Sequence, residues 1–256
     1  PNSEELFLRA RQNLETLIAD GVYALDPEPA IYVYRLTMGG QSQTGIVACC
    51  SIDEYKSGLI KKHEKVRPDK VEDRTAHILT VGAQTGLIFL AFRGTDTTAR
   101  LFAAAVAETP LYDFEGSDGI RHTVWRITET EPWIDAFAEV PELYVADGHH
   151  RAESAFLTRT KMRERHPDFK GDEPYNYVFA GMFPADDLAI MAYNRVVTDL
   201  NGLTENEFFE RLNESFIVSG ADRKEPSERG EICMYLSGKW YSLRFNVQFV
   251  REPDAI

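Results

Sequence analysis

The sequence has 256 residues, of which 43% are hydrophobic, and its formal net charge at pH 7 is −13. This hydrophobic share is ordinary for a globular protein, and no apolar run approaches the ~20 residues that span a bilayer. We therefore expect a soluble cytoplasmic protein without a membrane segment, and the acidic charge disfavours nucleic acid as a partner.

Apolar residues that recur every three or four positions predict helices, whereas alternating or continuous apolar runs predict strands. In chain order, the sequence predicts a helix over 3–20, a hairpin over 30–37 and 44–52, a helix over 70–81, a strand over 87–92, a helix over 97–107, a strand over 122–127, a helix over 132–140, a strand over 143–146, a helix over 149–166, strands over 177–183 and 188–197, a helix over 204–212, and a hairpin over 232–236 and 240–245. Hairpins interspersed with helices indicate an α+β fold with mixed sheets, in which residues 1–256 form a single domain or two closely packed lobes.

The cysteines have neither the number nor the spacing of a disulfide framework or a Cys-x-x-Cys metal site. Cys49 and Cys50 are adjacent in a predicted strand, and Cys233 lies in another. Free cysteine is usually buried, so we expect Cys49 and Cys50 to be buried thiols with a structural role.

Residues 143–151 have the pattern of a buried strand that turns directly into a helix. The apolar run ends before Asp147, and Gly148 lets the backbone bend sharply. The first amides of a helix have no partner within it and, with the helix dipole, form an anion site. Arg151 lies in the first turn, where a cation is disfavoured unless an anion such as phosphate pairs with it. We therefore predict a phosphate site built from Asp147, Gly148, His149, His150 and Arg151.

The same loop has two other interpretations. In the simpler one, Asp147 is only an N-cap and the histidines are incidental, which leaves Arg151 unexplained. In the other, a metal ion is held by the nitrogen and oxygen donors of His63, Glu64, Asp147, His149 and His150. No spacing typical of a transition-metal site supports that set, so we predict no dedicated metal site. A magnesium ion carried by substrate phosphates needs fewer protein ligands.

A second concentration of charge, over 61–74, precedes the helix predicted over 70–81 and extends into it. Its basic members and histidine are Lys61, Lys62, His63, Arg67 and Arg74, with acidic residues interleaved. The simplest interpretation is a solvated charged surface. The functional interpretation is a lid or wall over a polyanionic substrate, with Glu64 as a general base kept ionised by neighbouring donors.

Together these segments resemble the family called domain of unknown function 1015. The similar motifs are Lys-Lys-His-Glu (61–64), Arg-Pro-Asp-Lys (67–70), Asp-Arg-Thr (73–75), Gly-Ala-Gln-Thr-Gly (82–86) and Ala-Asp-Gly-His-His-Arg (146–151). The resemblance covers nearly the whole sequence. Members of that family usually continue beyond the point where this sequence stops, so we expect it to be truncated relative to the family at one or both ends.

The Asp-Gly-His-x-Arg turn also resembles the phosphate loop of the ParB and sulfiredoxin superfamily, which implies a ParB/sulfiredoxin-like core. It is closest in motif to the free serine kinases of that group, which place this loop at the nucleotide phosphates and use an upstream glutamate as base. The resemblance implies that residues 147–151 hold phosphate and that Glu64 is the base. Sulfiredoxin uses a loop cysteine, and none stands between Asp147 and Arg151, so we expect no reductase.

These observations predict a phosphotransferase that uses ATP, ADP or pyrophosphate, with Mg²⁺, to phosphorylate a small hydroxyl metabolite, serine being one candidate. Its catalytic residues would be Glu64, His149 and Arg151, and its partner a small phosphorylated molecule. The sequence has no Walker-type or Rossmann-type motif. Hydrolysis of a phosphoester or nucleotide at the same site, and a non-enzymatic nucleotide-binding regulatory module, remain alternatives, and the oligomeric state is open.

Overall fold

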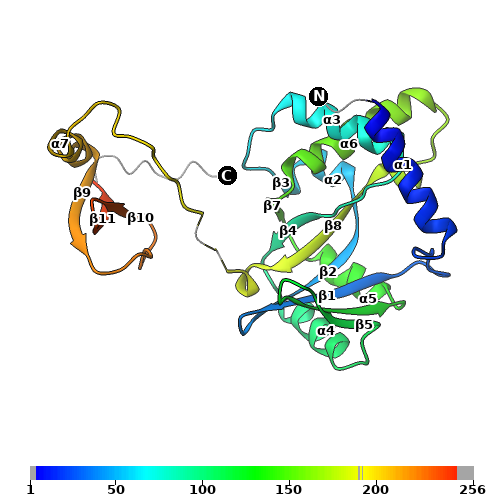
Figure 1. Ribbon diagram of the computed structural model, residues 1–256. Helices are drawn as coiled ribbons and strands as arrows, with labels where there is room; N and C mark the ends of the chain where they lie inside the picture. Colours follow the sequence, from blue (N-terminus) through cyan, green and yellow to red (C-terminus); the bar gives the residue numbers. More distant parts are fainter. Residues whose placement is uncertain (1–3, 190, 192, 247–256) are drawn as a thin grey trace. The chain divides into compact units, whose positions relative to one another are not determined.

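A mixed sheet of eight strands organises the first of two compact units into which the chain divides, Pro1–Leu188 and Ala189–Ile256. The computed structural model describes residues 4–189, 191 and 193–246 (Figure 1). The strand order in this sheet is β3-β7-β4-β8-β2-β1-β6-β5. Its strands are β1 (Ile31–Met38), β2 (Gln41–Ser51), β3 (Ile60–Lys61), β4 (Ile88–Phe92), β5 (Tyr112–Glu115), β6 (Arg121–Ile127), β7 (Leu143–Asp147) and β8 (Tyr177–Pro184). An α+β fold with a mixed sheet is therefore confirmed.

The helices of the first unit lie between these strands in the sequence. They are α1 (Glu4–Ala19), α2 (Ile52–Ser57), α3 (Pro68–Val81), α4 (Asp96–Val106), α5 (Glu131–Ala138) and α6 (His149–Arg165), with 3-10 turns at Pro174–Asn176 and Ala185–Asp187. Helix α6 packs on β4 and β8, α3 packs on α6, and α1 packs on α3, whereas α4 packs on β1 and β6 (Figure 1). Within the described residues, no helix combines the length and apolarity needed to span a membrane.

The core of the first unit gathers on one face of the sheet because side chains alternate between the two faces of each strand. Val33, Ile46, Leu90, Val145 and Met182 come from five different strands and are all buried. The helices complete this cluster with Ile52 and Tyr55 of α2, Phe102 and Ala105 of α4, Trp133 of α5, and Ala152 and Ala155 of α6.

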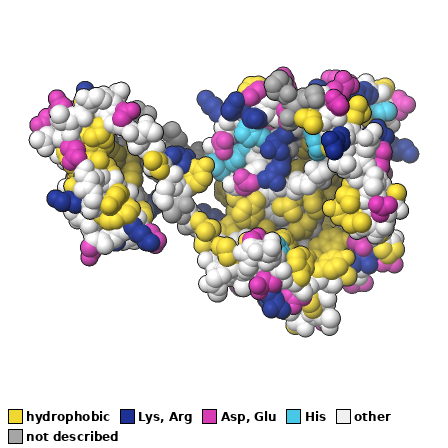
Figure 2. All heavy atoms as spheres, viewed as in Figure 1, with side chains coloured by type: hydrophobic (Ala, Val, Ile, Leu, Met, Phe, Trp, Pro, Cys, Tyr) yellow, Lys and Arg dark blue, Asp and Glu magenta, His cyan; other side chains and the backbone are white. Residues whose placement is uncertain are grey.

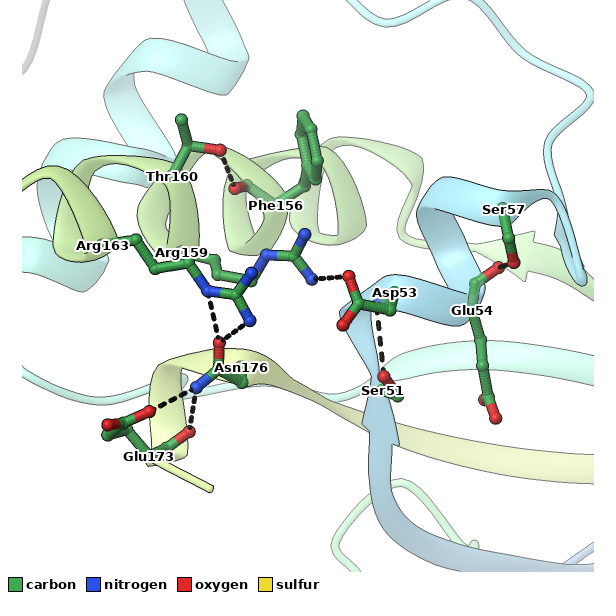
Figure 3. A network of polar contacts seen from close by, with 10 residues as sticks. All are labelled: Ser51, Asp53, Glu54, Ser57, Phe156, Arg159, Thr160, Arg163, Glu173 and Asn176. Atoms are coloured by element: carbon green, nitrogen blue, oxygen red, sulfur yellow. Dashed lines mark hydrogen bonds and ion pairs between the residues drawn. The ribbon is translucent and has the colours of Figure 1, made fainter. Parts of the chain in front are cut away.

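The second half of helix α6 is held by polar contacts with two other segments (Figure 3). Arg159, which is buried, donates a 2.7 Å hydrogen bond to Asp53 at the start of α2. Nearer the end of the helix, Nε of Arg163 donates to Oδ1 of Asn176 at 2.9 Å, and Nδ2 of Asn176 donates to Glu173 at 2.8 Å. These contacts hold the body of α6, so the position of its first turn is set by the fold.

The second unit contains α7 (Glu205–Ser215) and a sheet in the order β10-β11-β9, built from β9 (Phe216–Ala221), β10 (Glu231–Leu236) and β11 (Lys239–Phe245). Thr204 and Glu207 form a reciprocal capping box at the start of α7. The side chain of Glu231 is fully buried and accepts hydrogen bonds from Arg223, Ser227 and Ser242. These bonds hold the pKa of the Glu231 carboxyl down at about 2.

Two predictions from the sequence are wrong. The described residues of 188–197 form no strand, and Tyr193 and Val196 in this stretch are 83% and 91% exposed, because the segment joins the two units and pairs with no strand there. Cys50 is buried as expected, but Cys49 is exposed, since adjacent residues on a strand point to opposite faces. Ser3, the first residue of the helix predicted over 3–20, lies outside the described residues. Four short elements, α2, β3, β5 and β9, were not predicted from the sequence.

Candidate functional site

The turn between β7 and α6 requires glycine for two separate reasons. Gly148 has φ 93°, in the left-handed region that glycine adopts without strain. A Cβ atom there would also lie 3.2 Å from Nε and Nη2 of Arg151 and from Cγ2 of Ile88. A side chain at this position would therefore both strain the backbone and displace Arg151.

The first turn of α6 has no side-chain cap. Gly148 is the N-cap residue, and no side chain accepts a hydrogen bond from the first amides. Asp147 belongs to β7 and does not cap the helix, so the structure does not support the interpretation of Asp147 as an N-cap. The amides of His149, His150 and Arg151 donate no hydrogen bond to any described residue, which leaves the positive end of a helix of 17 residues open.

Arg151 turns back over the glycine and is already paired. Its Nη2 donates a 2.6 Å hydrogen bond to Oδ2 of Asp147, and its Nη1 donates to the carbonyl of Leu87. The side chain of Arg151 is 34% exposed and that of Asp147 is 72% exposed. Asp147 therefore offsets the unfavourable position of Arg151 near the helix N-terminus, and a bound phosphate is not needed to explain it.

The loop that receives Arg151 is held in place by Gln84, which the sequence analysis did not single out. Nε2 of Gln84 donates to the carbonyl of Tyr177 at 2.8 Å, and Oε1 accepts from the amide of Phe179 at 3.1 Å. One amide side chain thus fastens the Gly-Ala-Gln-Thr-Gly segment to β8. The family motif over 82–86 was the signal in the sequence, but only the fold reveals what the glutamine contacts.

His149 is buried at the base of the site, with 5% of its side chain exposed. Burial and the neighbouring His63 lower the pKa of His149, so the ring is neutral at pH 7. Its Nδ1 atom lies 3.6 Å from Oε2 of Glu64, and the ring of His63 packs edge-on against it with centroids 4.4 Å apart. Glu64 thus lies beside His149 at the start of α6, although Glu64 and His149 are far apart in the sequence.

His150 connects the start of α6 to the segment before α3. Its Nε2 atom accepts a 3.2 Å hydrogen bond from the amide of Arg67, which precedes Pro68 at the start of α3. Ser154, one turn further along α6, donates to the carbonyl of Val71 at 3.1 Å. These contacts fix α3 against α6 and place Arg74, from the second turn of α3, at the site.

A cavity of about 310 Å³ opens at this point, lined by Glu64, Arg74, Asp147, Gly148, His149, His150 and Arg151. Arg74 is exposed and makes no ion pair or hydrogen bond with any described residue. Figure 2 shows histidine and basic side chains gathered on one face of the first unit, beside a hollowed area of hydrophobic side chains. The structure therefore brings together the loop residues, Glu64 and Arg74 from the sequence-predicted set.

Three basic residues predicted for the site point elsewhere. Lys61 forms a 3.0 Å ion pair with Glu142. Lys62 forms a 3.2 Å ion pair with Glu153 and lies over the ring of Tyr55, and Arg67 pairs with Asp69 at 2.8 Å. They do not line the cavity, whereas His63 contributes through its contact with His149. Among the described residues, no group of three or more His, Cys, Asp or Glu side chains is arranged to hold a metal ion.

Comparison with known proteins agrees with the motifs around this cavity. The model of the family described as "Protein of unknown function (DUF1015)" matches residues 1–254. The chain belongs to this family. No curated protein and no solved structure matches the chain significantly. The function proposed for this DUF1015 protein therefore depends on the chemistry of the cavity.

Proposed function

We propose that this DUF1015 protein is a phosphotransferase, which moves a phosphoryl group from a nucleotide or pyrophosphate to a small hydroxyl metabolite. The observation that carries the proposal is the cavity at the uncapped start of α6, which combines open helix amides with the side chains of Arg74 and Arg151. The resemblance of residues 147–151 to the phosphate loop of the ParB and sulfiredoxin superfamily, and a core related to that superfamily, form part of this proposal.

Phosphoryl transfer depends mainly on positioning and on stabilising negative charge, so the residues of the cavity suit it. Arg74 has a free guanidinium, which can accept an anion without breaking an existing pair. Arg151 has one such pair, with Asp147, and the bond to the carbonyl of Leu87 keeps it in place. We therefore assign the holding of phosphate to both arginines and to the amides of the first turn of α6.

Glu64 is the general base in this proposal. Its side chain is 57% exposed and lies on the cavity, where it can accept the proton of an acceptor hydroxyl. The neutral His149 beside it adds no positive charge to the cavity, so the charge that holds phosphate comes from the arginines. His149 lies beside this carboxylate, with Nδ1 3.6 Å from Oε2 of Glu64, and limits where the base can lie.

The carboxylates of Glu64 and Asp147 are hard oxygen donors on the cavity, which fits a magnesium ion held chiefly by substrate phosphates. When bound, Mg²⁺ would neutralise charge on the transferring group. Asp147 must then be shared between the ion and Arg151.

Hydrolysis at the same site is the second candidate, and it is favoured by the exposure of Asp147 and Glu64, at 72% and 57%. Water can reach a base that is exposed to this extent. A phosphotransferase must exclude water or bind its acceptor firmly, so the two candidates differ in whether an acceptor competes with water.

The test is a phosphorus NMR assay of the full chain with Mg²⁺ and ATP, ADP or pyrophosphate, with and without serine and other small alcohols. A phosphomonoester that forms only with acceptor supports transfer, whereas release of inorganic phosphate alone supports hydrolysis. Arg74→Gln should abolish most of either activity, and Arg9→Gln on α1, which lies outside the cavity, is the matched control. Binding of none of the three phosphate donors would rule out both candidates.

A further inference from the structure

A second cavity, of about 560 Å³, lies in the first unit at the opposite end of β4 from the phosphate site. The charged residues on it are Arg35, Asp96, Asp186 and Asp187, and its apolar lining includes Phe102 and Val106 of α4. A volume of this size and a lining that is mainly apolar with a few charged groups are typical of small-molecule sites.

The two cavities are separate because β4 runs between them. Leu87, whose carbonyl accepts from Arg151, precedes β4, whereas Gly94 follows it and lines the second cavity. With the rise of a strand, these residues lie roughly 20 Å apart. β4 and β8 are parallel, and both end at the second cavity, where ligands of parallel sheets commonly bind.

Charges of opposite sign line this cavity without pairing with each other. Nε of Arg35 donates to Oγ1 of Thr44 at 3.0 Å, and the amide of Thr44 donates to Oδ2 of Asp187 at 3.3 Å. The guanidinium lies over the ring of Trp125, 5.3 Å from its centroid. Arg35 forms no ion pair with the part of the chain that the structure describes. Thr44 thus holds the guanidinium of Arg35 and the carboxylate of Asp187 side by side. Each of these two groups can still form hydrogen bonds with a ligand.

The start of α4 is already partly capped. Thr95 and Thr98 form a reciprocal capping box, so the cap already uses the amide of Thr98. Asp96 in the first turn adds a negative charge that the helix dipole offsets. A carboxylate group in this cavity therefore has Arg35 as its cationic partner, and an ammonium group has Asp186 and Asp187.

We infer that this cavity binds a zwitterionic amino acid with an apolar side chain. Its carboxylate pairs with Arg35, its ammonium group lies at Asp187 and Asp186, and its side chain packs against Phe102 and Val106. The inference does not depend on the proposed phosphotransfer, because it concerns a different end of the sheet.

The test is calorimetry of the full chain with L-leucine, L-methionine and L-phenylalanine. Two analogues of leucine separate the charges: 3-methylbutylamine lacks the carboxylate, and 4-methylpentanoate lacks the ammonium group. We expect saturable binding of at least one of the amino acids. For leucine, each analogue should bind about tenfold more weakly or worse, since each loses a charge-assisted hydrogen bond.

Arg35→Gln and Asp187→Asn should each weaken amino acid binding by a similar factor, whereas Arg100→Gln, on the exposed side of α4, should not. If Arg35→Gln proves unstable, Arg35→Lys can be used in its place. This variant keeps the positive charge but lacks the forked geometry of the guanidinium, so it should lose part of the affinity. No binding of any of the three amino acids at millimolar concentration would overturn the inference. Equal binding of leucine and 3-methylbutylamine would do the same, because it would indicate a site for cations only.

Discussion

Replacing Arg151 with alanine tests whether the start of α6 is an anion site. A hydrogen bond between charged groups contributes about 1.5–3 kcal/mol, so Arg151→Ala should weaken pyrophosphate binding roughly 10- to 150-fold. The change also leaves Asp147 unpaired on the same cavity, and its charge repels the ligand. The structural cost should be small, about 1 kcal/mol, because the Arg151–Asp147 pair is partly exposed at 34% and 72%.

Calorimetry with pyrophosphate measures the affinity, and thermal unfolding followed by circular dichroism measures the stability. We expect the double variant Asp147→Asn with Arg151→Ala to recover several-fold of the lost affinity, because it removes the unpaired carboxylate. Pyrophosphate binding by Arg151→Ala that equals the wild type would refute the assignment. A loss of stability much larger than about 1 kcal/mol would instead identify Arg151 as a structural residue.

Three further predictions follow from the same geometry. Glu64→Gln should lower turnover by about 10²- to 10⁴-fold and leave the affinity for pyrophosphate within a few-fold, as expected for a general base; an equal loss of both would point to a structural role. Gly148→Ala should cost about 1–2 kcal/mol of stability in denaturant titration, from its φ of 93°, and should weaken pyrophosphate binding because the new Cβ displaces Arg151; unchanged affinity would argue against that displacement. Because the folded-state pKa of Glu231 is about 2, below its ordinary 4.5, its stabilisation is complete above pH 4.5 and is lost as the pH falls toward 2. In Glu231→Gln, stability at pH 7 should fall and its decline over that pH range should be shallower, whereas an unaltered pH profile would contradict this role.

The strand-turn-helix over 143–165 could be predicted from the sequence because its causes are local. An apolar run, a glycine and a helical pattern follow each other directly, and the structure places β7, Gly148 and α6 there. The structure also confirms the predicted helices α1 and α3 and the β1–β2 hairpin, whose sequence patterns are local in the same way. The strand predicted over 188–197 failed because its apolar residues find no pairing strand among the described residues, and pairing is a long-range property.

What the sequence by itself determined is the chemical character of the loop: a bend that favours glycine, the first amides of a helix, and an arginine in the first turn. That no side chain caps those amides was decided by the structure. Which charged groups face that loop was decided only by the tertiary structure, because it depends on segments that are distant in the chain. Lys62 pairs with Glu153, 91 positions away, and therefore does not line the cavity, whereas α3 brings Arg74 to it. Gln84 acquires its role in the same way, since its partners on β8 become neighbours only when the sheet forms.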